Sequence, residues 1–149
     1  GAEVMQKNIE TLGPISYTDS EISYANVILK ETGKPLKGID GAIHPLLPSL
    51  PAQGGSTDVG DVSQLVPTIR MSATVAASGG PWHSWAVVAC TGMSIGHKGM
   101  IYASKALGMT MVDLFTDPKL VRRVKEDFKN NRTNPSYEPR IPEGPPKLN

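Results

Sequence analysis

A glycine-rich loop that carries a carboxylate, and a histidine downstream of it, have the greatest potential for chemistry in this sequence. The loop reads Gly-Gly-Ser-Thr-Asp over 54–58, so that Thr57 and Asp58 follow the glycine pair. Glycine adopts backbone conformations closed to other residues, so such a loop can bring short side chains close to a bound group. His83 stands in a Gly-Gly-Pro-Trp-His-Ser turn. Connections of this kind are where functional residues gather.

His83 is a candidate metal ligand. A neutral imidazole is a common ligand for zinc and manganese, and its second nitrogen needs a partner, for which Ser84, Thr57 and Asp58 are candidates. One histidine cannot hold a catalytic metal alone, because such a site normally takes about three protein ligands. The alternative is a histidine that is hydrogen-bonded in its loop and has no further role, and the residues alone favour this alternative.

Asp58 and Asp61 are three residues apart, a spacing that can place two carboxylates on one helical face. There they could bind a metal or support a ligand histidine. Alternatively, Thr57 or Asp58 simply caps a short helix over 59–65. The residues favour a structural role for Asp61 and leave both readings open for Asp58. The loop does not fit a phosphate-binding motif, because the glycine spacing differs and the lysine is missing.

The neighbours of His83 and the other two histidines could also contribute. Trp82 and Trp85 flank His83 and could line a pocket for an aromatic or acyl group, or only close off the core. His97 is a further candidate for this pocket, but because it lies next to the apolar residues of a predicted helix, we expect it to be buried and hydrogen-bonded. His44 precedes a proline in a proline-rich loop, and we expect it at the surface.

Most of the chain has helical patterns. Thr18 stands three residues before Glu21, which is a capping-box pattern at the start of a helix. We predict helices over 4–12, 19–32, 59–65, 96–114 and 120–128, and a Gly/Pro-rich loop over 33–55. The predicted apolar stripe of the long helix comprises Gly96, Met100, Ala103, Leu107, Met111 and Leu114. Its small residues would allow close approach of another element near the start of this helix.

The period of the pattern changes after Pro67. Ile69, Met71, Ala73 and Val75 alternate with polar residues, which predicts a strand. The short apolar run over 85–90 cannot be assigned from its period. Helices and strands that interleave predict an α/β fold. A lone strand cannot form a sheet, so we expect helices packed on a small sheet that is completed by strands lying elsewhere.

Composition limits the function classes. A chain of 149 residues fits one domain, expected over 1–133 with an extended proline-rich tail over 134–149. The net charge of +1 gives no strong field that would favour nucleic acid or a membrane. No apolar run is long enough to span a bilayer, and none resembles a signal peptide. The single cysteine, Cys90, is expected to be a buried, inert thiol and suits a reducing, cytoplasmic compartment.

Four separated motifs resemble those of one enzyme family. The 54–58 loop is similar to a Gly-Gly-Thr-Ser-Asp motif of the dinuclear metallo-amidohydrolases related to carboxypeptidase G, aminoacylase and peptidase T. His83 falls where this family carries its last metal ligand. The motifs over 56–63, 67–68, 83–85 and 95–100 occur in the order that resembles most the aminobenzoyl-glutamate utilisation protein B branch, and the match includes 17–21 and the proline-rich end.

The resemblance implies part of a three-layer αβα catalytic domain that cleaves the amide bond of N-acyl or N-aroyl amino acids such as p-aminobenzoyl-glutamate. Two zinc or manganese ions would activate the attacking water, with a glutamate as general base. It implies that His83 ligates one metal, and that Asp58 lies near the site as a support or substrate-side residue. Thr57 and Ser84 would assist, whereas His97 is typical of the branch without an assigned role.

The family's other metal ligands, its general base and its lid domain are not found in this sequence, which opens Gly-Ala-Glu without an initiating methionine. We therefore expect the C-terminal part of the catalytic domain, inactive alone and holding no metal by itself. Expected partners are a small-molecule N-acyl amino acid, the rest of the catalytic domain, and further subunits in a homo-dimer or hetero-oligomer. The alternative is a non-catalytic binding or assembly module that retains the fold.

Overall fold

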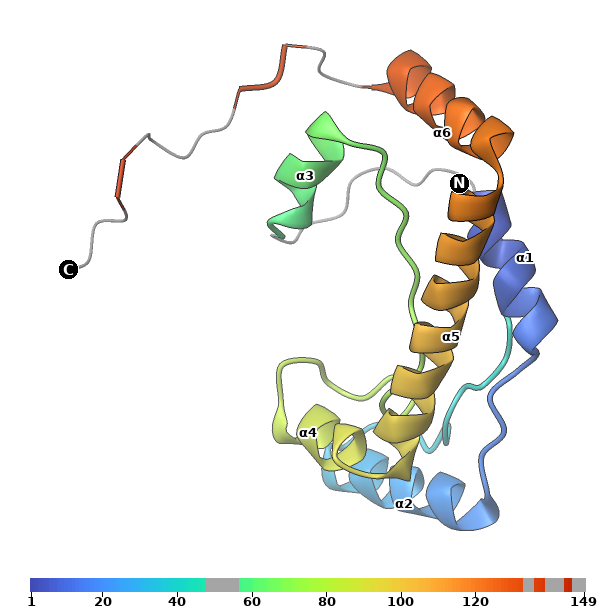
Figure 1. Ribbon diagram of the computed structural model, residues 1–149. Helices are drawn as coiled ribbons and strands as arrows, with labels where there is room; N and C mark the ends of the chain where they lie inside the picture. The colour runs from blue at the N-terminus through green and yellow to red at the C-terminus, as the bar shows by residue number, and fades with distance from the viewer. Residues whose placement is uncertain (48–56, 133–135, 139–143, 146–149) are drawn as a thin grey trace.

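The computed structural model describes residues 1–47, 57–132, 136–138 and 144–145. This part contains six α-helices, which are α1 (Ala2–Leu12), α2 (Asp19–Glu31), α3 (Val59–Leu65), α4 (Trp85–Thr91), α5 (Ser94–Thr116) and α6 (Pro118–Asn131). Figure 1 shows a curved arrangement in which α1 lies along α5, α2 and α4 lie near the start of α5, and α6 follows its end. No helix in the described ranges combines the length and apolar character that crossing a membrane requires.

Local sequence signals set the ends of α2. The Thr18 hydroxyl accepts a hydrogen bond from the Glu21 backbone N–H, and the Glu21 carboxylate accepts one from the Thr18 N–H at 2.7 Å. Together these form the capping box that the sequence predicts. Beyond the helix, Gly33 adopts a left-handed conformation with φ +67°, where a side chain would be strained. The predicted helix over 19–32 is thereby confirmed.

Glu21 also joins α2 to the first turns of α5. Its carboxylate accepts hydrogen bonds from Lys98 Nζ and from the Ser94 hydroxyl, both at 2.6 Å, and Lys98 Nζ additionally donates to the Ser16 carbonyl. The hydrogen bond from Lys98, followed by those from Ser94 and Thr18, lowers the pKa of Glu21 from 4.5 to about 2. A buried carboxylate held in its charged form thus fixes this corner of the molecule.

The core lies where α2, α4 and the start of α5 meet. Its buried residues are Ala25, Ile28, Leu29, Ala77, Ala86, Cys90 and Ile95. The apolar run over 85–90, which periodicity could not assign, forms most of α4, and it turns Ala86 and Cys90 towards this core. Cys90 is fully buried, as expected.

Small residues allow α5 to pack closely near its start. A Cβ on Gly96 would lie 2.3 Å from the Thr91 carbonyl oxygen, and one on Gly99 would lie 2.2 Å from the Thr74 carbonyl oxygen. The predicted close approach is confirmed. The predicted apolar stripe, however, is not the buried face. Residues Ile95, Gly96, Gly99, Ala106 and Thr110 are buried, whereas Met100, Leu107 and Met111 are exposed.

Further along, α1 packs on α5 through a buried polar group. Asn8 is buried, and its side-chain amide donates to Thr110 Oγ1 at 3.1 Å and to Asp113 Oδ2 at 2.8 Å. A buried amide requires such partners, because an unsatisfied polar group in the interior costs about 1–3 kcal/mol. The pairing therefore fixes how α1 sits along α5.

The predicted α/β fold is wrong, because the described residues contain no strand and no sheet. The segment 67–75 is irregular, and its alternation reflects one-sided packing: Ile69, Met71 and Ala73 are half-buried, while Arg70 and Ser72 are exposed. A strand is defined by pairing with another strand. The hydrogen bonds of this segment are instead local or made to other loops. One example is the hydrogen bond that Thr74 Oγ1 donates to the Asp40 carbonyl oxygen. Of the tail, only 136–138 and 144–145 are described, without helix or strand.

Candidate functional site

His83 lies in the loop that leads into α4 and has an unusual backbone. Its φ is +56°, and it is the one non-glycine residue in the described part of the chain with positive φ. This left-handed conformation costs a residue with a side chain about 1–2 kcal/mol relative to glycine. The side chain is exposed, and its imidazole makes no hydrogen bond to any residue that the structure describes. Strained residues of this kind cluster at functional sites.

Ser84 fixes the turn that carries His83. Its hydroxyl donates to the Pro81 carbonyl oxygen at 2.6 Å and accepts a hydrogen bond from the Ala86 N–H, which caps α4. Ser84 therefore acts on the backbone on both sides of His83 and does not touch the imidazole ring. On either side of the histidine, Trp82 and Trp85 are largely exposed.

The second predicted group stands at the start of α3. Thr57 Oγ1 accepts a hydrogen bond from the Val59 N–H at 3.3 Å, whereas the Asp58 side chain makes no capping bond. The predicted short helix over 59–65 is confirmed, with Thr57 rather than Asp58 bonding to its first turn. Asp58 is exposed, and Asp61 accepts a hydrogen bond from the Tyr137 hydroxyl. The preceding residues 54–56 lie outside the described residues.

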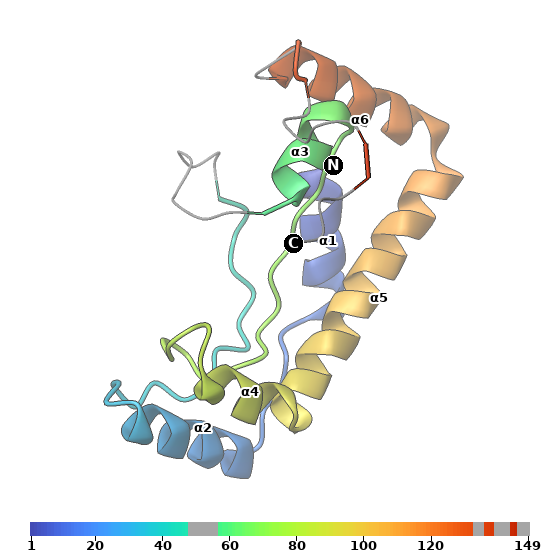
Figure 2. The same ribbon diagram turned by 90° about the vertical axis from the view of Figure 1, so that its left-hand side faces the viewer.

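The structure does not bring these two groups together. Figures 1 and 2 show α3 near α6, while the loop that carries His83 adjoins α4 at the other end of α5. Among the described residues, no group of three or more His, Cys, Asp and Glu side chains is arranged to hold a metal. The imidazole of His83 fits the chemistry of one ligand, but the residues described do not complete a set. Its role as a ligand, and the supporting role of Asp58, stay predictions.

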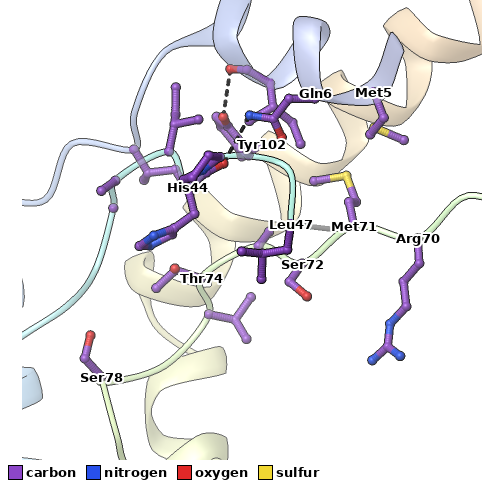
Figure 3. Close-up of a pocket in the computed structure, with 18 of the residues that line it drawn as sticks. Met5, Gln6, His44, Leu47, Arg70, Met71, Ser72, Thr74, Ser78 and Tyr102 are labelled. Carbon is purple, nitrogen blue, oxygen red and sulfur yellow. Dashed lines mark hydrogen bonds between the residues drawn. The ribbon is translucent and has the colours of Figure 1, made fainter. Parts of the chain in front are cut away.

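A cavity of about 570 Å³ lies between α1 and two irregular segments, 41–47 and 70–79. Trp82 lines it, but His83 and Asp58 do not. Most of its lining is apolar, and the described lining contains no Asp or Glu. Figure 3 shows the Arg70 guanidinium directed away from Gln6 and Tyr102. The volume is in the range of small-molecule pockets, and the lining suits an apolar group rather than a metal.

Two hydrogen bonds hold the upper wall of this cavity. The Gln6 amide donates to the His44 carbonyl oxygen at 3.1 Å, and the Tyr102 hydroxyl donates to the Ile9 carbonyl oxygen at 3.1 Å (Figure 3). The residues concerned come from distant parts of the sequence, and no local pattern in the sequence links them. The cavity could therefore not be predicted from any motif or period.

His44 and His97 both lie at the surface. The expectation for His44 is confirmed, and its Nε2 lies 2.8 Å from Asp40 Oδ2. The hydrogen bond from the Ala42 N–H, followed by that with His44, lowers the pKa of Asp40. The expectation of a buried His97 is wrong, because the face of α5 that carries it points to solvent. His97 is exposed, whereas Gly96 and Gly99, which pack against Thr91 and Thr74, are buried.

Comparison with known proteins gives one informative similarity. The chain is 37% identical over 87 residues to one subunit of the p-aminobenzoyl-glutamate hydrolase of Escherichia coli (strain K12). The alignment covers 58% of this chain but only 18% of that protein, so the chain spans less than a fifth of its relative's length. No protein-family model matches the chain, and no solved structure matches it. The similarity supports a relation to the family of this hydrolase subunit.

Proposed function

We propose that this chain forms part of a metal-dependent amidohydrolase that cleaves the amide bond of N-acyl or N-aroyl amino acids, with p-aminobenzoyl-glutamate as the candidate substrate. The similarity to a hydrolase subunit of that name supports the substrate class. The observation that carries the proposal is His83, an exposed histidine in a left-handed conformation without a hydrogen-bond partner among the described residues.

His83 would act as one metal ligand. The ring of His83 is exposed and makes no hydrogen bond to a described residue, so its nitrogens are open to a ligand. The backbone that presents it is held by Ser84 through the bonds to Pro81 and Ala86. Fixing the backbone limits the directions that the ring can take, which is what a ligand position requires. The remaining ligands and the general base would come from residues outside the described part of the chain.

A pair of zinc or manganese ions, one of them held by His83, would supply the activation of water that amide hydrolysis needs near neutral pH. Within this chain, Trp82 and Trp85 would contribute to substrate recognition. Both are exposed beside His83, with exposed fractions of 69% and 55%. Large aromatic surfaces of this kind can pack against the ring of an aroyl group. Asp58 would lie on the substrate side only if α3 approaches the His83 loop in the complete enzyme.

The test is a pair of histidine substitutions in the full natural protein that contains these residues. His83→Ala should reduce hydrolysis of p-aminobenzoyl-glutamate by at least about a hundredfold, because loss of a metal ligand removes the activated water, and should lower the metal content measured by mass spectrometry. His44→Ala, which removes another exposed histidine, should leave both unchanged. Normal turnover in His83→Ala would remove His83 from the mechanism.

A second candidate function is a non-catalytic assembly module. It is favoured by the number of large apolar side chains that the described part of the chain exposes, among them Trp82, Val88 and Phe115. One measurement distinguishes the two proposed functions. A full natural protein that binds no divalent metal, yet still assembles with a partner, would support the module and contradict the hydrolase.

A further inference from the structure

A pocket of about 340 Å³ lies between α3, α6 and the start of α1. We call it the α3–α6 pocket. Its lining includes Gln64 from α3, Val124 and Phe128 from α6, and Gly1 from the start of the chain. Figure 2 shows the N-terminus beside α3 and α1, with α6 above them. Sites that bind small molecules measure about 300–1,000 Å³, so the pocket is large enough to admit an occupant.

Two residues that line the α3–α6 pocket each have a buried polar atom without a hydrogen-bond partner among the described residues. These atoms are Gln64 Oε1, on α3, and Arg132 Nε, directly after the end of α6. An unpaired buried polar atom costs about 1–3 kcal/mol, so native structures pair nearly all such atoms. The amide oxygen needs an N–H donor, and the guanidinium N–H needs an oxygen acceptor. An occupant of the pocket should therefore offer both a donor and an acceptor.

α3 has few contacts with the other helices that the structure describes. It has seven residues, none of them buried, and no other described helix packs extensively against it. Its apolar side chains Val59, Val62 and Leu65 are each about half exposed. An isolated helix shorter than about 12 residues is only marginally stable in water, so α3 needs contacts from a neighbouring segment. The α3–α6 pocket is the space beside α3 in which such a segment would lie.

Gly1 is held closely at the edge of the pocket. A Cβ at this position would lie 2.9 Å from Ile69 Cδ1 and 3.7 Å from Val124 Cγ2. The Gly1 carbonyl oxygen accepts hydrogen bonds from the backbone N–H groups of Val4 and Met5 in the first turn of α1. These contacts fix the start of the chain next to α6. A residue bonded to the Gly1 nitrogen therefore begins at the pocket.

We infer that the polypeptide that precedes Gly1 in the longer protein occupies the α3–α6 pocket and holds α3 in place. This inference rests on the proposed function, which requires a longer protein, and the similarity covers only 18% of the hydrolase subunit. Each residue other than proline carries one backbone N–H and one C=O, which are the donor and the acceptor that Gln64 and Arg132 need. A second copy or a free ligand has no such covalent connection to the pocket.

Hydrogen exchange tests whether the pocket is filled in the full natural protein. Exchange of the backbone amides over 59–65 should be at least about tenfold slower there than in the 149-residue chain. Gln64→Leu removes the acceptor and should speed this exchange at least about fivefold in the full natural protein, but not in the 149-residue chain. Ser63→Ala is the matched control, because the Ser63 hydroxyl donates to the Gly60 carbonyl oxygen within α3 and its loss should act equally in both.

Cysteine cross-linking identifies the occupant. Ser63 lines the pocket, so Ser63→Cys in the full natural protein is combined with single cysteines placed in turn at the residues that precede Gly1. At least one pair should form a disulfide on mild oxidation, as identified by mass spectrometry of the linked peptides. The same cysteines combined with Lys129→Cys should not, because Lys129 is exposed on α6 and does not line the pocket. Protection of α3 without a cross-link to Ser63→Cys shows that another part of the protein or a bound small molecule fills the pocket, and overturns the inference.

Failure of this inference can be told apart from failure of the proposed function, because neither measurement depends on hydrolysis. A full natural protein with both the protection and the cross-link, but without hydrolysis of p-aminobenzoyl-glutamate, contradicts the hydrolase alone. A full natural protein that hydrolyses this substrate, but exchanges the α3 amides as fast as the 149-residue chain, overturns the inference alone. An effect of Gln64→Leu that is equal in both forms also overturns the inference.

Discussion

At the scale of single residues, His83 and Glu21 differ in burial and in hydrogen bonding. Glu21 is buried, and its charge is satisfied by Lys98, Ser94 and Thr18. His83 is exposed, strained in its backbone and without a hydrogen-bond partner among the described residues. The first arrangement stabilises the fold, whereas the second costs stability. The two residues therefore predict opposite effects of substitution.

Replacing His83 by glycine should stabilise the chain. Glycine adopts φ +56° without a Cβ clash, so His83→Gly should raise the free energy of unfolding by about 1 kcal/mol. His83→Ala keeps the Cβ and should show no such gain. Urea unfolding of both variants measures the difference. If His83→Gly is less stable than His83→Ala, the backbone at this position is not strained.

Replacing Glu21 should have the reverse effect. Glu21→Gln should lower the free energy of unfolding at pH 7 by about 2 kcal/mol, because hydrogen bonds to a charged group are lost. The folded pKa of Glu21, about 2, lies below its ordinary value of 4.5. The carboxylate therefore contributes its full stability above pH 4.5 and loses it as the pH falls towards 2.

The difference in stability between wild type and Glu21→Gln should accordingly be constant near neutral pH and shrink between pH 4.5 and 2. Glu31→Gln removes an exposed carboxylate at the end of the same helix and serves as the matched control. A gap between wild type and Glu21→Gln that persists at pH 2 would show that the charge of Glu21 is not what stabilises the corner between α2 and α5.

At the scale of elements, local signals in the sequence predict where helices lie, but they do not predict which elements pair or which helix faces are buried. Thr18 and Glu21 define the start of α2 within four residues of sequence, and Gly33 defines its end, so the sequence alone suffices there. The alternation over 69–75 carries no information on a pairing partner, and pairing is what distinguishes a strand from an extended segment packed on one side. Similarly, the apolar residues of α5 indicate a helix but do not tell which face is covered.

Substitutions at two glycines of α5 distinguish the effect of close packing on stability from that of helix propensity. A Cβ at position 99 would collide with the backbone at Thr74, whereas nothing lies within 4 Å of one at Gly108. Gly99→Ala should lower the free energy of unfolding by about 1–3 kcal/mol because the segment beside it must shift. Gly108→Ala should raise it by up to about 1 kcal/mol through helix propensity.

Thermal or urea unfolding compares the two glycine variants. Equal effects in the same direction would mean that α5 does not lie against the segment around Thr74.

At the scale of the whole molecule, the features that sequence reasoning missed depend on contacts between distant residues. The cavity wall joins Gln6 to His44, and the α1–α5 contact joins Asn8 to Thr110. No period or motif connects residues so far apart. The sequence also could not show how the proposed site is arranged. Its two predicted groups, at the start of α3 and before α4, are separated in the described structure.

The separation of these groups predicts the behaviour of the isolated chain. The purified 149-residue chain should release no p-aminobenzoate from p-aminobenzoyl-glutamate, with zinc or manganese added, because about three protein ligands are normally required for a catalytic metal. A colorimetric assay for the aromatic amine detects the product. The full natural protein in the same assay is the positive control, and measurable hydrolysis by the isolated chain contradicts the prediction.

The burial of Cys90 has a practical consequence for the stability of the core between α2, α4 and α5. Its thiol is shielded completely, so a thiol-specific reagent can reach it only while those helices are apart. The speed at which the native protein is labelled therefore reports how often this end of the molecule opens. Because the chain has one cysteine, the labelling reports on that single location and needs no engineered probe.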